Sequence, residues 1–156
     1  MSVHTAPKTL LDELDHAGVA YELISHQRTD SATAEAAALG VPPREVAKTL
    51  VLTTPEGFVL AVLPASERLD LPKVRDFLGT KDVELASEEL LAGAYPEFEL
   101  GAVPPFVHGD RVLVDTRVCE NVSVLLDAGT HEQSLRVKTR DLVSLSNALL
   151  ADICRD

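Results

Sequence analysis

The chain has 156 residues, of which 46% are hydrophobic and 25% are charged, and its 14 basic and 25 acidic groups give a net charge of −11. This length and composition predict a single domain over residues 1–156 and exclude a disordered chain, while an aromatic content of 4% requires an aliphatic core. The acidic surplus argues against a protein that holds nucleic acid by electrostatics alone, although a brief encounter with a nucleic-acid end is compatible with it.

The first half of the chain predicts two helices and three strands. In chain order we expect a helix over 7–17, a strand over 19–24, a helix over 32–39, and two hairpin strands over 48–53 and 58–63. Leu10, Leu11 and Leu14 recur at helical spacing in the first helix. Gly18 and Gly40 follow the two helices, where glycine commonly ends a helix.

The second half predicts three more helices and four strands. In chain order we expect a helix over 71–78, a strand over 83–86, a helix over 87–92, strands over 111–115, 122–126 and 134–137, and a last helix. Thr139 is expected to cap this last helix, and one of its faces would carry Leu142, Leu145, Leu149 and Ile153. Because helices and strands mix without strict alternation, the expected fold is α+β, with one mixed, strongly curled and barrel-like sheet flanked by helices.

Three features of the sequence indicate a cytoplasmic protein without a membrane segment. The apolar run Phe58–Leu63 is far shorter than the roughly 20 residues that a membrane-spanning helix needs. Residues 1–8 lack a basic region followed by an apolar stretch, so no signal peptide is expected. The two cysteines, Cys119 and Cys154, form neither a disulfide framework nor a zinc pattern, and the sequence suggests no metal and no cofactor.

Lys48 is a candidate functional residue because it starts the most strand-like segment of the chain. Strand alternation places it on one face with Val46, Leu50 and Leu52, and that face is expected to be buried. A lysine there either extends its ammonium group to the edge of the apolar surface or sits in a pocket, where its pKa falls or it binds an anion. The strand pattern by itself favours the first alternative.

Two loops are further candidates. Gly101–Pro105 combines a glycine with two prolines, so its backbone could hold a sugar or a carbonyl group in a stiff loop, although a plain connector has the same composition. Asp127–His131 lies between two expected strands, and Gly129 is typical of a turn. His131 could act as a base or orient a substrate, but a single loop histidine is more often solvated. Asp115 ends an expected strand, where an aspartate belongs to a site or caps a turn.

Taken in order, these segments resemble the YbaK/prolyl-tRNA synthetase-associated editing domains. The strand Val46–Leu52 resembles the family's lysine-bearing strand, and Gly101–Pro105 fits its GxxxP loop. Further similar segments are 61–71, with a P…LDL pattern, 141–142 and 151–153. The resemblance covers most of the chain and depends on the order and spacing of the segments rather than on any one of them.

This resemblance implies a free-standing, trans-editing aminoacyl-tRNA deacylase, which hydrolyses the ester of a mischarged tRNA, typically Cys- or Ala-charged tRNA for proline. Its ligand would be the acceptor end of the aminoacyl-tRNA, and prolyl-tRNA synthetase is an expected partner. The family lysine corresponds to Lys48 and the GxxxP glycine to Gly101, which are the expected catalytic residues. The residues expected to bind substrate are Pro105, Asp127, Gly129, Thr130 and His131.

Differences between this sequence and the family's pattern leave open which amino acid is removed from the tRNA. Val107 stands near the end of the GxxxP loop where much of the family has glycine. Asp127–Gly129 replaces the Ser-Gly-Gly typical of the branch that removes Cys, and Gly129–His131 is closer to the branch inserted in synthetases. Two alternatives to this deacylase also stay open: a non-catalytic module on the same fold that partners a synthetase, and a hydrolase of another small acyl ester.

Overall fold

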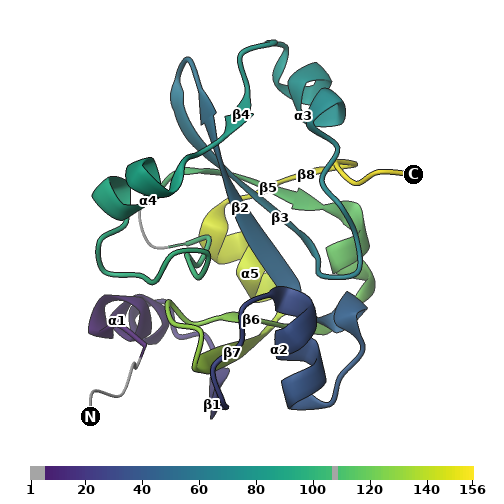
Figure 1. Ribbon diagram of the computed structural model, residues 1–156. Coiled ribbons are helices and arrows are strands. Elements are labelled where there is room, and N and C mark those ends of the chain that lie inside the picture. Colours follow the sequence, from purple (N-terminus) through teal and green to yellow (C-terminus); the bar gives the residue numbers. More distant parts are fainter. Residues whose placement is uncertain (1–5, 107–108) are drawn as a thin grey trace.

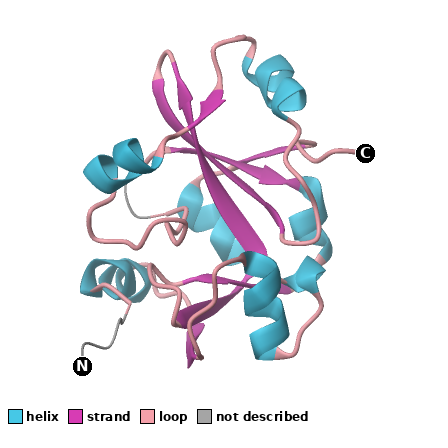
Figure 2. Cartoon of the chain, in the orientation of Figure 1, coloured by secondary structure: helices cyan, strands magenta, loops and turns pink. Residues whose placement is uncertain are grey.

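The computed structural model describes residues 6–106 and 109–156, which form helices and two β-sheets (Figures 1 and 2). The strands are β1 Tyr21–Ser25, β2 Ala47–Thr54, β3 Gly57–Pro64, β4 Glu84–Leu85, β5 Arg111–Asp115, β6 Ser123–Asp127, β7 Gln133–Lys138 and β8 Leu149–Ala151. The larger sheet has the order β4-β2-β3-β5-β8, with antiparallel pairs on the β4 side and parallel pairs on the β8 side. The smaller sheet, β1-β7-β6, is antiparallel.

Local signals in the sequence set the helix boundaries. The helices are α1 Lys8–His16, α2 Ala32–Leu39, α3 Leu71–Leu78, α4 Glu88–Ala94 and α5 Thr139–Ser146, with two 3-10 turns, η1 Pro43–Glu45 and η2 Thr116–Glu120. At the start of α2, the Ser31 side chain accepts a hydrogen bond from the Ala34 N–H, and Gly40 ends the helix with a φ of 70°. The helices and strands expected up to residue 138 are confirmed, with small shifts at their ends.

The β2–β3 hairpin is the longest paired unit of the fold and joins the two sheets. Its strands pair along their whole length, from Ala47 opposite Pro64 to Thr54 opposite Gly57. Just before β2, Val46 forms an isolated parallel bridge with Leu125 of β6 in the smaller sheet. In Figure 1 the hairpin runs from the end of the molecule near α3 and β4 down to the smaller sheet.

Both faces of this hairpin are covered by aliphatic side chains. One face contributes to a core shared with α1 and the smaller sheet, which includes Leu10, Leu14, Val51, Leu60, Val62, Val124, Leu126 and Leu135. The other face packs beneath α3 in a second cluster, which includes Leu52, Val59, Ala61, Val74, Leu113 and Ile153. Burial on both faces explains why β3 is a continuous apolar run rather than an alternating one, and it confirms the expected aliphatic core.

The α+β class is confirmed, but two expectations about the architecture are corrected. The described strands form two separate open sheets rather than one strongly curled, barrel-like sheet. The last helix stops at Ser146, because Asn147 adopts a left-handed conformation with a φ of 51°, and Leu149–Ala151 then pairs with β5 as β8. Thr139 is not its side-chain cap, since its hydroxyl donates to the Asn121 carbonyl over 2.6 Å.

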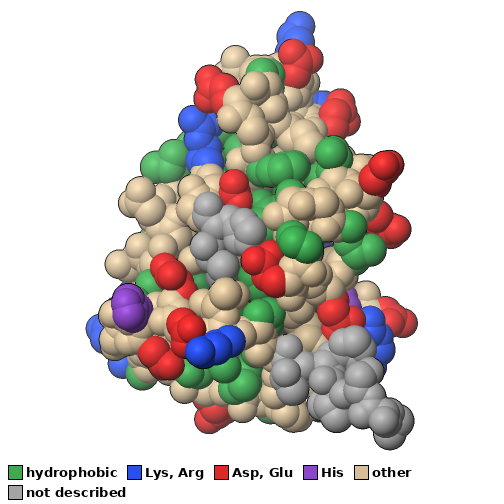
Figure 3. Space-filling view, turned by 90° about the vertical axis from the view of Figure 1, so that its left-hand side faces the viewer, with side chains coloured by type: hydrophobic (Ala, Val, Ile, Leu, Met, Phe, Trp, Pro, Cys, Tyr) green, Lys and Arg blue, Asp and Glu red, His purple; other side chains and the backbone are tan. Residues whose placement is uncertain are grey.

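The surface carries the acidic surplus. Figure 3, viewed from the side of α1 and α4, shows Asp and Glu side chains scattered over this face among fewer Lys and Arg side chains. Within residues 6–106 and 109–156, no helix combines the length and the apolar character required to cross a membrane.

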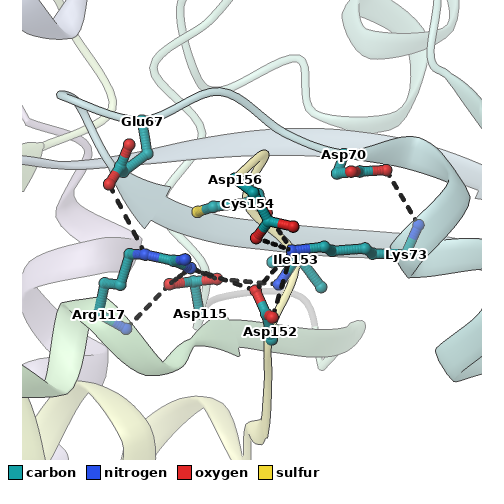
Figure 4. A network of polar contacts seen from close by, with 9 residues as sticks. All are labelled: Glu67, Asp70, Lys73, Asp115, Arg117, Asp152, Ile153, Cys154 and Asp156. Atoms are coloured by element: carbon teal, nitrogen blue, oxygen red, sulfur yellow. Dashed lines mark hydrogen bonds and ion pairs between the residues drawn. The ribbon is translucent and has the colours of Figure 1, made fainter.

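A polar network fixes the end of the chain against the larger sheet (Figure 4). Asp115 is fully buried and accepts hydrogen bonds from the N–H groups of Ile153 and Arg117, both over 2.9 Å. The Arg117 guanidinium lies 3.3 Å from Asp115 and 3.6 Å from the carboxylate of Glu67 in the β3–α3 loop. Asp115 therefore caps a turn, which is one of the two roles expected for it. Through Arg117 and Ile153 it also links the end of β5 to the β3–α3 loop and to the segment after β8.

Replacing Asp115 should destabilise the protein strongly. Asp115→Asn weakens a fully buried acceptor of two backbone N–H groups and removes one charge beside the Arg117 guanidinium, whose side chain is 31% exposed, so the expected loss is about 2 kcal/mol in the free energy of unfolding. The matched control is Asp152→Asn, which removes another carboxylate 3.2 Å from Arg117 whose side chain is 57% exposed, and it should cost clearly less. Urea unfolding measures both, and equal losses would contradict the central role of Asp115.

Candidate functional site

A cavity of about 280 Å³ opens where the two sheets meet and brings together four of the expected site residues. Its wall includes Lys48 from β2, Gly101 from the loop after α4, Asp127 from the end of β6 and His131 from the β6–β7 turn. The residues before α2, Asp30 and Ser31, complete one side. Segments from four distant parts of the chain thus form one small pocket.

The pocket lies along an unpaired edge of β2. The two residues of β4 pair only with Leu52 and Thr53, so no described strand lies beside Ala47–Leu50 on that side. The Val51 carbonyl faces this edge, where it accepts from the Ala86 N–H over 2.9 Å. Because backbone groups alternate along a strand, the N–H and carbonyl of Thr49 face the same edge and border the pocket.

Lys48 combines the two alternatives expected for it. The burial of its face is partial: Val46 and Leu52 are fully buried, whereas Lys48 and Leu50 are half-buried. Its ammonium group donates a hydrogen bond to the Glu67 carbonyl over 2.6 Å, and burial lowers its pKa, with the neighbouring Arg68 acting in the same direction. An ammonium group has three donors, so two remain after the bond to the Glu67 carbonyl.

Gly101 and His131 lie next to each other in the wall of the pocket. Gly101 has a φ of +80°, which favours glycine, and a Cβ there would lie 3.6 Å from the His131 ring. The His131 ring donates from Nε2 to the Leu100 carbonyl over 2.6 Å. The other ring nitrogen, Nδ1, lies 3.7 Å from the Asp127 carboxyl.

Gly129 and Thr130 lie outside the pocket wall and shape the turn that carries His131. Gly129 has a φ of +82°, and a Cβ there would lie 2.7 Å from both Phe98 and Pro7. Thr130 is buried and donates to Glu99 over 2.5 Å, and Glu99 also accepts from the His131 N–H over 3.0 Å. These contacts position His131 rather than reach a ligand.

Glu99 is the ionised group that secures this turn. Burial acts to raise its pKa, but hydrogen bonds from Arg28, Thr130 and the His131 N–H lower its pKa to about 2. The Arg28 guanidinium lies 2.7 Å from the Glu99 carboxylate. Glu99 was not among the residues expected from the sequence, where it belongs to an unremarkable acidic stretch.

Pro105 lies deeper than expected. It is buried, as are its neighbours Pro104 and Phe106, and Val103 rather than Pro105 contributes to the pocket wall. The departure from the family at Val107 falls outside the described residues.

A buried carboxyl group beneath the pocket was missed by the sequence analysis. Glu35 of α2 is 1% exposed, and its carboxylate accepts from the Ser134 hydroxyl, which lies 2.8 Å from Nε2 of His26. Burial and the adjacent Glu35 carboxyl raise the pKa of Asp127. Only one weak signal in the sequence marks this residue: Glu35 is the one charged residue within Ala32–Leu39.

The arrangement suits positioning and electrostatic stabilisation of a small polar ligand. It offers the Lys48 cation, backbone groups of a strand edge, an imidazole and a carboxyl pair. Among residues 6–106 and 109–156, no group of three or more His, Cys, Asp or Glu residues is placed to hold a metal ion. A larger cavity of about 520 Å³, beside Cys119, Val122 and Arg140, contains none of the expected site residues.

The family model for the aminoacyl-tRNA editing domain matches residues 26–145, a range that contains every expected site residue. A proline–tRNA ligase of Thermosipho africanus (strain TCF52B) is 37% identical over 54 residues. That match covers 34% of this chain, which spans only 10% of the length of the ligase.

Solved structures share the fold. A crystal structure of a protein proposed as a trans-editing enzyme for prolyl tRNA synthetase has a TM-score of 0.88 at 24% identity, covering 99% of this chain and all of the other. The hypothetical protein APE2540 has a TM-score of 0.86 at 24% identity, covering 95% of this chain and all of the other. At this identity the likeness is one of fold.

The Asp127 carboxyl should give the stability of the protein a defined dependence on pH. Burial and the adjacent Glu35 carboxyl raise its pKa from 3.8 to about 8 in the folded chain. The folded state therefore binds more protons than the unfolded state between these values, and the free energy of unfolding should fall as the pH rises through them. One proton limits this slope to about 1.4 kcal/mol per pH unit, which urea unfolding at successive pH values can measure.

Asp127→Asn should reduce this slope, because an amide does not titrate and only the contribution of the buried Glu35 carboxyl, whose pKa burial also raises, is left. Asp76→Asn changes an exposed carboxyl on α3 and should keep the wild-type slope. A slope that is the same in Asp127→Asn as in the wild type would show that Asp127 does not titrate in this interval.

Proposed function

Because this chain belongs to the family of aminoacyl-tRNA editing domains, we propose that it is a deacylase that hydrolyses the ester of a mischarged aminoacyl-tRNA. The observation that carries this proposal is the convergence of Lys48, Gly101, Asp127 and His131 on one cavity of about 280 Å³. This volume is at or below the low end of small-molecule sites, which supports a small amino acid attached to the terminal ribose as the ligand.

The chemistry required is modest, since an aminoacyl ester is already activated. Positioning and electrostatic stabilisation are sufficient, with attack by water or by a group of the substrate, such as the ribose 2′-OH or a cysteine thiolate. We assign to Lys48 the neutralisation of the terminal phosphate or of the developing oxyanion. The backbone around Gly101 would hold the terminal adenosine or the ester carbonyl.

We further propose that the substrate is Cys- or Ala-charged tRNA for proline. The likeness to a proline–tRNA ligase and to a protein proposed as a trans-editing enzyme for prolyl tRNA synthetase supports this choice. A synthetase discriminates poorly against a slightly smaller side chain, because one methylene contributes only about 1–3 kcal/mol, and a second site can hydrolyse the errors.

The net charge of −11 bears on how the tRNA arrives. An acidic surface gives little long-range attraction to phosphates, so we propose that the tRNA is held weakly or is delivered by prolyl-tRNA synthetase as a partner. The same acidity favours one alternative function, a non-catalytic module that regulates a synthetase.

A panel of aminoacyl-tRNAs tests the proposal. The wild type should hydrolyse Cys- or Ala-charged tRNA for proline and leave correctly charged tRNA intact. Lys48→Ala should lower kcat/KM by about 100-fold or more, because it removes a preorganised charge from the site. The matched control is Lys81→Ala, an exposed lysine outside the pocket, which should keep wild-type activity.

Adding the synthetase should raise the rate at limiting enzyme. No hydrolysis across the panel, with or without a synthetase, would reject the deacylase and leave the binding module.

A further inference from the structure

The carboxyl pair formed by Glu35 and Asp127 has no role in the hydrolysis described above. Glu35 is 1% exposed beneath the pocket, whereas the Asp127 side chain is 18% exposed and belongs to the pocket wall. Asp127 Oδ1 is buried and has no hydrogen-bond partner among the described residues. The oxygen left for a ligand is Oδ2, which lies on the side of His131.

Among residues 6–106 and 109–156, no Lys or Arg side chain forms an ion pair with Glu35 or Asp127, and the imidazoles that face the pair are those of His26 and His131. The Arg28 guanidinium is paired with the Glu99 carboxylate over 2.7 Å rather than with Glu35 or Asp127. His26 reaches Glu35 only through the Ser134 hydroxyl, and the His131 ring lies 3.7 Å from Asp127. Lys48 and Asp30 border the same pocket, but the Lys48 ammonium group is bonded to the Glu67 carbonyl.

Two adjacent carboxyl groups repel each other when both are ionised, which favours a proton on the empty pair. Burial raises the pKa of both groups. A cation placed against Asp127 would stabilise the doubly ionised pair and release that proton to solvent.

An aminoacyl ester carries such a cation, its α-ammonium group, next to the bond that is cleaved. We propose that Asp127, supported by Glu35, is the acceptor of the substrate α-ammonium group and that its binding expels the proton shared by the pair. This inference rests on the proposed deacylase function and extends it, because it makes the free α-amino group a condition for recognition. Esters of acids without that group would be poor ligands.

Two stable adenosine analogues test the inference by calorimetric titration at about pH 6.5. The probes are 3′-(L-alanylamino)-3′-deoxyadenosine and 3′-(propionylamino)-3′-deoxyadenosine, which differ only in the α-amino group. The wild type should bind the first about tenfold to a hundredfold more tightly, as expected for one charged hydrogen bond. Titration in phosphate and in imidazole buffer should show the release of close to one proton with the first probe.

Two variants separate recognition from structural support. Asp127→Asn should reduce the preference for the amino probe to about threefold or less, because the charge is lost and the shape is kept. Glu35→Gln should keep the preference but reduce proton release, since it removes the Glu35 charge that helps to raise the Asp127 pKa while the burial of Asp127 remains; a merely structural role for Glu35 would not change proton release alone. Asp76→Asn, exposed on α3, is the control.

The outcomes distinguish this inference from the proposed function. Equal binding of the two probes by a wild type that deacylates tRNA would overturn the inference and leave the deacylase standing. Loss of the preference in Asp30→Asn but not in Asp127→Asn would also overturn it. Absence of deacylation with all tRNAs would instead reject the function on which it rests.

Discussion

The site depends on one asymmetry of β2, which has a full-length partner on one side and only a two-residue partner on the other. The long pairing with β3 fixes Lys48 within a strand that is packed on both faces, so its backbone is held rigidly. The short pairing with β4 leaves an edge on which the pocket forms. Unpaired strand edges tend to recruit further chains, and here the loop before Gly101, the start of α2 and the β6–β7 turn occupy that place.

Near the pocket, Glu99 and Lys48 each have a polar partner, whereas no Lys or Arg among the described residues pairs with Glu35 or Asp127. Glu99 is ionised because three donors converge on it, and Lys48 is tethered to a carbonyl in the β3–α3 loop. Glu35 and Asp127 lack an equivalent cation, which is why burial dominates their titration. An acidic protein can therefore present a site that selects cationic character in one part of a ligand and negative charge in another.

Sequence reasoning succeeded where the signal is local. Gly40 ends its helix as its position predicts, and the pocket brings together Lys48 and Gly101, which strand and loop chemistry had made candidates. It failed where a contact joins residues that are distant in the chain: Glu35 is of interest only because it lies beside Asp127, more than 90 positions away. The last helix was extended too far because Leu149 and Ile153 continue its spacing, although pairing with β5 and the bond to Asp115 determine their structure. Thr130 and Gly129 were placed in the right turn, but their contacts are with the protein.

The bond between the Ile153 N–H and the buried Asp115 has a consequence for biosynthesis. Asp115 also organises Arg117 and, through it, the loop whose Glu67 carbonyl holds Lys48. A ribosome makes residue 153 long after residue 48, so the hairpin can form during translation while the carboxylate still lacks its last donor. The network that includes Asp115, Arg117 and Glu67 therefore gains its last backbone donor late in synthesis, after the hairpin that carries Lys48.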